Sequence, residues 1–248
     1  MAKNYDNDIQ ENIFWVTMTD LFLGMFMVFA VLFFSFVINT GQGTRVVQDA
    51  TKEMTQEVVE QMQKKGIKVS IIDETKPNQP HSAIEMDPDT GLVRISDLQL
   101  FDINSAKLTP KGKEFLKSFI PVYFDTLYNT DVSKYVQAVI IQGHTCSTGF
   151  RGNYSAEEQY LKNMSLSMNR AYNVADYVFD LSKGKNYNSK LLKTIKVEGA
   201  SSSSPVMIKG KEDYAKSRRV DLRLVYKKPP QDVLLDMIKD GGNYDDIR

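Results

Sequence analysis

Residues Trp15 to Ile38 read WVTMTDLFLGMFMVFAVLFFSFVI, an apolar run interrupted by one charged residue, Asp20. About 24 residues of helix rise roughly 36 Å, and a bilayer core of about 30 Å needs about 20 apolar residues. The run is therefore long enough to cross a membrane with some tilt. It is too long for a signal-peptide core, the preceding residues 1–14 are mostly acidic and polar, and Asn39-Thr40-Gly41 offers no clear cleavage site. We therefore expect a retained membrane anchor.

Asp20 needs a physical explanation, because a carboxylate inside a membrane helix is costly. One reading is a side chain that reaches back to the interface near Trp15, but the Asp stem is short. The other reading is a site that faces partner helices and takes up and releases a cation. Moving one charge across a membrane yields about 2.3 kcal/mol per 100 mV. Gly24 follows on the same helix face and permits close helix approach, whereas we expect Thr17 and Thr19 to bond backbone carbonyls one turn back.

Composition limits the classes of function. The chain has 31 basic and 31 acidic residues, so no global charge favours nucleic acid. Its one cysteine, Cys146, excludes a disulfide within the chain. With two histidines and one cysteine, a metal site is not expected. His144 and Cys146 have no evident third group to orient them, so we predict neither an enzyme nor a bound cofactor.

Residues 39–89 are interpreted as an amphipathic helix and linker. Gly41-Gln42-Gly43 is expected to end the membrane helix. A second helix then covers about residues 44–65, and its narrow apolar stripe predicts pairing with a partner or a second copy. The segment 67–86 contains two prolines and is interpreted as a connector with one strand-like piece, KVSII. The stripe consists of Val47, Met54, Val58 and Met62.

Residues 90–226 alternate between strand and helix patterns. Thr109 as N-cap and Pro110 in the first turn begin a helix that runs to about Leu127. A second helix runs from Ala156 to about Leu181, with Leu161, Leu166, Ala171, Val174 and Val178 facing inward. The predicted fold is a small α/β (α+β) domain with helices on one face of a mixed sheet, followed by a loosely held tail, 227–248. The predicted strands are 92–95, 98–101, 136–142, 194–198 and 220–226.

Five short motifs in this region resemble the OmpA-like peptidoglycan-binding family. They occur in the family order and spacing across about residues 90–226. They are FDINSAKL (101–108), GHT (143–145), NMSLSMNRA (163–171), the Gly199–Pro205 loop and SRRV (217–220).

The resemblance implies a pocket for the diaminopimelate of a peptidoglycan stem peptide. Arg170 occupies the position of the family Arg that takes the carboxylate, which suits a guanidinium fork. Thr145, Asn163 and Leu166 are the other expected contacts, although Leu166 also suits core packing and Asn163 a capping role. The chain departs from the family at Cys146, which replaces the Asp that takes the ammonium.

A thiol at position 146 is mostly neutral at pH 7 and cannot balance an ammonium group as a carboxylate does. Glu157 and Glu158 are nearby candidate substitutes in sequence. Cys146 is otherwise a half-buried thiol or a bridge between two copies in an oxidising compartment.

The order of membrane helix, amphipathic linker and OmpA-like domain resembles MotB-type stator subunits, above all the MotB-like subunit of Zorya anti-phage systems. In that family an Asp a few residues past a Trp or Tyr carries the ion, which would be Asp20. The resemblance implies a single-pass inner-membrane protein with a cytoplasmic tail (1–14) and a periplasmic domain. It implies a homodimer inside a pentameric MotA-like (ZorA-like) ring, anchored to peptidoglycan and conducting H⁺ rather than Na⁺.

Three alternatives remain open from the sequence. A flagellar MotB stator would share every feature above, and the gene neighbourhood would separate it from a defence subunit. A passive OmpA-like envelope tether would have no use for Asp20. An energy transducer of the ExbD/TolR type has one helix with an Asp, but its periplasmic domain lacks the motif series.

Overall fold

The computed structural model describes residues 2–72 and 82–227. The chain divides into two compact units, one of residues 1–46 with 229–248 and one of residues 47–228. The predicted tail (227–248) lies almost entirely outside the described residues, as does 73–81 of the predicted connector.

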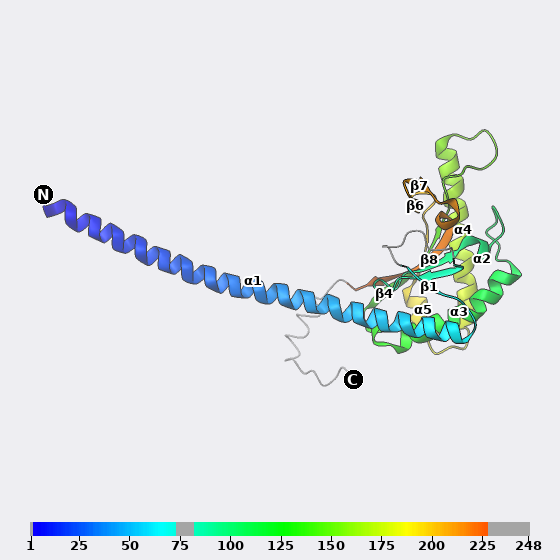
Figure 1. The fold of residues 1–248 in the computed structure, drawn as a ribbon, viewed down its shortest axis with the longest axis horizontal. Helices are drawn as coiled ribbons and strands as arrows, with labels where there is room; N and C mark the ends of the chain where they lie inside the picture. The colour runs from blue at the N-terminus through cyan, green and yellow to red at the C-terminus, as the bar shows by residue number, and fades with distance from the viewer. Residues whose placement is uncertain (1, 73–81, 228–248) are drawn as a thin grey trace. The chain divides into compact units, whose positions relative to one another are not determined.

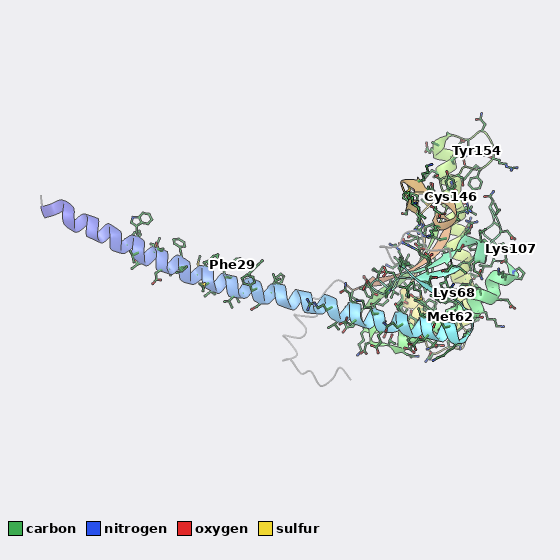
Figure 2. The ribbon with its side chains drawn as sticks, viewed as in Figure 1. Phe29, Met62, Lys68, Lys107, Cys146 and Tyr154 are labelled. Atoms are coloured by element: carbon green, nitrogen blue, oxygen red, sulfur yellow. The ribbon has the colours of Figure 1, made fainter. Side chains whose placement is uncertain are left out.

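The first unit is formed by the N-terminal part of helix α1 (Ala2–Lys64). Residues Phe14–Val37 are long and apolar enough to cross a membrane, and none of this segment is buried inside the protein. Large apolar side chains such as Phe29 are exposed along this part of the helix (Figure 2). The prediction that Gly41-Gln42-Gly43 ends the helix is wrong, since α1 is helical through these residues. A glycine weakens a helix by about 1 kcal/mol, which strong helical segments on both sides can offset.

The second unit, shown in Figure 1, is built on a mixed six-stranded sheet. The strand order is β1-β2-β3-β8-β4-β5. The outer pairs β1–β2 and β4–β5 are parallel, and the pairs between them are antiparallel. The bounds are β1 Ser70–Ile71, β2 Ile84–Met86, β3 Val93–Ser96, β4 Val136–His144, β5 Ile195–Gly199 and β8 Arg219–Tyr226. A separate hairpin pairs β6 (Met207–Ile208) with β7 (Lys211–Glu212).

The two faces of this sheet differ in chemistry because side chains alternate along a strand. Val93 of β3 and Ile141 of β4 both lie opposite Leu222 of β8, and all three are fully buried in the core. Arg94 and Gln142 lie opposite Asp221, one residue along, and therefore on the other face. The helices consequently cover one face, as predicted for this fold class.

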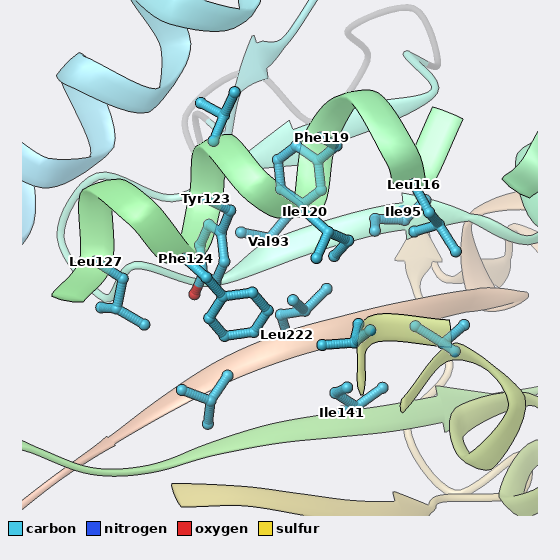
Figure 3. Close-up of a cluster of buried hydrophobic side chains, with 14 of the residues drawn as sticks. Val93, Ile95, Leu116, Phe119, Ile120, Tyr123, Phe124, Leu127, Ile141 and Leu222 are labelled. Carbon is cyan, nitrogen blue, oxygen red and sulfur yellow. The ribbon is translucent and has the colours of Figure 1, made fainter. Parts of the chain in front are cut away.

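The apolar face packs chiefly against α3 (Pro110–Asn129). Figure 3 shows Leu116, Phe119, Ile120 and Phe124 of this helix pointing toward the strands. The predicted start is confirmed, because Thr109 is the N-cap and its hydroxyl accepts from the Gly112 N–H. The remaining elements are α2 (Asp97–Leu100), the 3₁₀ helix Asp131–Lys134, α4 (Ala156–Ser182), α5 (Asn188–Thr194) and α6 (Tyr214–Ser217).

The C-terminal part of α1 belongs to this second unit. Met54, Val58 and Met62 are fully buried in the core of the same chain, and the Thr51 hydroxyl lies 2.8 Å from the Tyr226 hydroxyl. The prediction that this stripe pairs with a partner or a second copy is therefore wrong. A stripe of this period indicates burial but does not identify what buries it. The compact unit accordingly begins at Val47, well before residue 90.

Two local predictions also fail. Residues Leu98–Phe101 were expected to form a strand, but Asp97–Leu100 is one helical turn, and Phe101 makes only an isolated bridge to Leu108. Leu161 was expected to face inward but is 56% exposed, because α4 runs past the edge of the core near its N-terminal end. Ala171, Val174 and Val178, further along α4, are buried as predicted.

Candidate functional site

Asp20 lies on one face of the apolar part of α1. The same face carries Thr17, Leu21, Gly24, Met25 and Val28. The predicted backbone bonds of the threonines are confirmed: the Thr17 hydroxyl donates to Phe14 O at 2.9 Å and the Thr19 hydroxyl to Trp15 O at 2.7 Å. Asp20 is exposed on this helix. A carboxylate beside a small residue is suited to contact a neighbouring helix at close range.

In the second unit, α4 is brought unusually close to the sheet. Gly143 of β4 and Gly199 of β5 pair in register, and a Cβ on Gly143 would lie 2.0 Å from Ser167 O. The Ser167 hydroxyl accepts from the Ser201 N–H at 3.0 Å. The helix start is fixed by a capping box, in which Ser155 and Glu158 bond each other's backbone N–H. The contacts of Ser167 fix the position of the next turn of α4, which carries Arg170.

Arg170 is 1% exposed. Its Nε donates to Ser105 O at 2.9 Å, and its guanidinium lies over the Phe101 ring at 5.2 Å from the centroid. Its Nη1 lies 3.1 Å from the Asp97 Oδ1. Despite that short distance, neither atom has a hydrogen-bond partner of good geometry in the described part of the chain. The pair is thus a buried ion contact with unused hydrogen-bonding capacity on both sides.

Asp97 is the carboxylate of this cluster. It is 2% exposed, and burial raises the pKa of its carboxyl to about 6, against the opposing charges of Arg170 and Arg218. Burial likewise lowers the pKa of Arg170, and Asp97 opposes that shift. The Arg218 Nε lies 3.9 Å from the Asp97 Oδ2. A buried carboxylate between two guanidinium groups is the natural counter-ion here.

Cys146 completes the cluster. It is 4% exposed, and its Sγ lies 3.5 Å from the Arg218 Nη1 and within hydrogen-bonding reach of the Thr148 hydroxyl. The Arg218 side chain is 31% exposed, which makes it the solvent-facing member of the four. We call Asp97, Cys146, Arg170 and Arg218 the guanidinium cluster.

The other predicted contact residues, Thr145, Asn163 and Leu166, differ in how deeply they are buried. Thr145 is 3% exposed, and its hydroxyl has no hydrogen-bond partner among the described residues. Asn163 is buried and Leu166 half-buried, two turns and one turn before Arg170 on α4. Glu158 is used in the capping box, and the carboxylate that contacts both arginines of the cluster is Asp97. Arg218 lay within the SRRV motif, whereas no sequence signal identified Asp97.

A second buried ionic group lies on the polar face of the sheet. The His144 Nε2 lies 3.2 Å from the Asp221 Oδ2, and the Arg219 Nε donates to both Asp221 oxygens at 3.1 and 3.0 Å. Burial opposes ionisation of Asp221, but His144 and Arg219 outweigh it and lower the pKa of the carboxyl. Within the described residues no group of three metal-ligating side chains occurs.

No protein-family model matches the chain. The Zorya protein ZorB of Escherichia coli strain Crooks is 32% identical over 227 residues, which cover 91% of this chain and 93% of that protein. The chain belongs to the ZorB family. A second ZorB, from Escherichia coli O139:H28, is 22% identical over 232 residues, covering 91% of this chain and 85% of its own length.

The similarity to the ZorB relatives extends across both units, since 91% of the chain is aligned. Among solved structures, a protein described as MotB-like from Desulfovibrio vulgaris is similar at 16% identity and a TM-score of 0.49. That match covers 74% of this chain and 96% of that protein.

Proposed function

We propose that this ZorB-family chain is the core subunit of an ion-driven rotary motor of the inner membrane. In this proposal its α/β domain is anchored to peptidoglycan, and the motor acts in anti-phage defence. The observation that carries the proposal is Asp20, the single charged residue within the apolar segment Trp15–Ile38. A passive membrane anchor has no need of a carboxylate that is costly to insert.

Asp20 is the proposed ion site. Gly24 lies on the same face and allows another helix to approach Asp20 closely. The proposed neighbours are the helix of a second copy and a pentameric MotA-like (ZorA-like) ring, in a 5:2 complex. The carboxyl would take a cation, H⁺ in preference to Na⁺, from one side of the membrane and release it on the other. Each charge crossing 100 mV supplies about 2.3 kcal/mol for movement of the ring.

The α/β domain is the proposed anchor, on the periplasmic side. Its proposed stem-peptide contacts are Thr145, Asn163, Leu166 and Arg170. Arg170 has an unused donor and Thr145 an unpartnered hydroxyl among the described residues, and both suit a polar ligand. Arg170 is 1% exposed, whereas the Arg218 side chain of the same cluster is 31% exposed and is the member that a ligand meets first.

The motor part of the proposal is tested by ion flux. The chain is purified with its ring partner, reconstituted in liposomes with an internal pH dye, and energised by a potassium diffusion potential. We expect flux through the complex, its loss with Asp20→Asn, and little flux through the chain alone. Asn keeps the side-chain shape and removes the titratable group. High flux through the chain alone, or full flux with Asp20→Asn, would refute the assignment.

A further inference from the structure

The guanidinium cluster has an uneven charge. At neutral pH it contains two guanidinium groups, Arg170 and Arg218, and one carboxylate, Asp97. Asp97 lies 3.1 Å from Arg170 but 3.9 Å from Arg218, so its charge serves Arg170 first. One positive charge is left over, and it belongs to Arg218.

Arg218 lies where its positive charge can contact a ligand from solvent. It is the solvent-facing member, at 31% side-chain exposure, whereas Asp97, Cys146 and Arg170 are between 1% and 4% exposed. In the described part of the chain its guanidinium contacts are a long approach to a thiol sulfur and an ion pair at 3.9 Å. A guanidinium has five N–H donors, and neither contact is a good hydrogen bond to oxygen.

The buried residues at the cluster also have hydrogen-bond donors without acceptors among the described residues. Among the described residues, the Arg170 Nη1 has no hydrogen-bond acceptor of good geometry, and neither has the hydroxyl of Thr145, which adjoins Cys146 in the chain. Both residues are more than nine-tenths buried. Unpartnered buried donors are rare in native proteins, so both groups are suited to donate to a polar ligand.

From these observations we infer that Arg218 is a specificity-determining residue of the domain, and that the cluster recognises a carboxylate group of the peptidoglycan stem peptide without requiring its free amine. This inference rests on the proposed anchoring function. A carboxylate can accept two N–H bonds from one guanidinium, whereas an ammonium would be repelled by the exposed charge. Asp97, the carboxylate of the cluster, is buried and engaged by Arg170, and the Glu212 carboxylate near Cys146 accepts from the Ser147 N–H at 3.1 Å.

The inference is tested with chemically modified cell walls. Full-length chain in detergent is co-sedimented with sacculi from a diaminopimelate-containing bacterium, in three forms: unmodified, acetylated on free amines, and amidated on free carboxylates. We expect equal binding to unmodified and acetylated sacculi and about tenfold weaker binding to amidated sacculi, the loss expected for one charge-assisted contact.

Variants assign the effect to Arg218. Arg218→Gln should bind unmodified sacculi about tenfold more weakly and should lose nothing further on amidation. Cys146→Asp places a carboxylate beside Arg218 and should weaken binding similarly, whereas Cys146→Ser should not. Lys196→Gln, an exposed charge on β5, is the matched control and should bind as the unaltered chain does. Tyrosine circular dichroism in the near ultraviolet confirms that each variant is folded.

The outcomes separate this inference from the function on which it rests. If the chain binds no form of the sacculus, the anchoring proposal fails and the inference fails with it. If acetylation abolishes binding and amidation does not, anchoring stands and the inference is overturned. Undiminished binding by Arg218→Gln would also overturn it.

Discussion

Replacing the buried methionines in the C-terminal part of α1 with alanine tests whether the second unit begins at Val47. Met54 and Met62 are fully buried in its core. Replacing a buried methionine with alanine typically lowers the free energy of unfolding by about 2–5 kcal/mol. The two residues are eight positions apart, or about 12 Å along a helix, far enough for their effects to add. We therefore expect Met54→Ala and Met62→Ala together to lower the free energy of unfolding by about 4–10 kcal/mol.

The assay is guanidinium unfolding of the full chain in mild detergent, followed by near-ultraviolet circular dichroism of tyrosine. Tyr123 and Tyr187 are buried in the same core and report on its packing. Gln56→Ala, on the exposed side of the same helix, is the matched control and should change stability by less than about 0.5 kcal/mol. If the methionine variants leave the unfolding midpoint unchanged but alter self-association, the stripe is an interface between copies and our placement of it is refuted.

Three further predictions concern the site and its support. Because the folded Asp97 pKa of about 6 exceeds the unfolded value of about 3.9, its ionisation destabilises the fold; the unaltered chain should lose up to about 3 kcal/mol relative to Asp97→Asn as pH rises from 4 to 6.5, measured by denaturant titration. A pH-independent difference would contradict this. Ser155→Ala should lower unfolding free energy by about 1 kcal/mol through loss of the cap, with Ser155→Thr retaining most of it in thermal melts. Gly143→Ala should cost more than about 2 kcal/mol, because its Cβ would lie 2.0 Å from Ser167 O; an unchanged melting temperature would show that α4 can shift without cost.

The regular parts of the fold were predictable from local chemistry. Thr109 and Pro110 start α3 because a capping hydroxyl and a preset φ act within one turn. The strand β8 was predictable because its first half alternates between a core face and a polar face. These signals depend on neighbours in sequence, so a single chain contains them in full.

The failures depend on contacts between distant segments. The stripe of α1 has the same period whether it is covered by a second copy or by the chain's own domain. The Asp97–Leu100 turn replaces a strand where the chain passes from β3 to the region of α3. Asp97 and Arg170 are separated by more than seventy positions, so their ion pair was invisible in the sequence.

The sequence motifs identify only some residues of the candidate site, because the others are brought there by contacts between distant segments. Arg170 and Cys146 were selected by position within motifs, and the structure brings both into one cluster. The motifs do not show which charges of the site are neutralised. The fold brings Asp97 to Arg170 as its counter-ion and leaves Arg218 as the exposed cation.

The most direct test of the central claim is phage plating on cells that carry the complete operon with Asp20→Asn at matched protein level. Thr19→Val is the control, since Thr19 bonds Trp15 O and lies off the Asp20 face. We predict that protection is lost with Asp20→Asn and retained with Thr19→Val. Full protection with Asp20→Asn would contradict an ion-driven defence function and would favour a passive envelope tether.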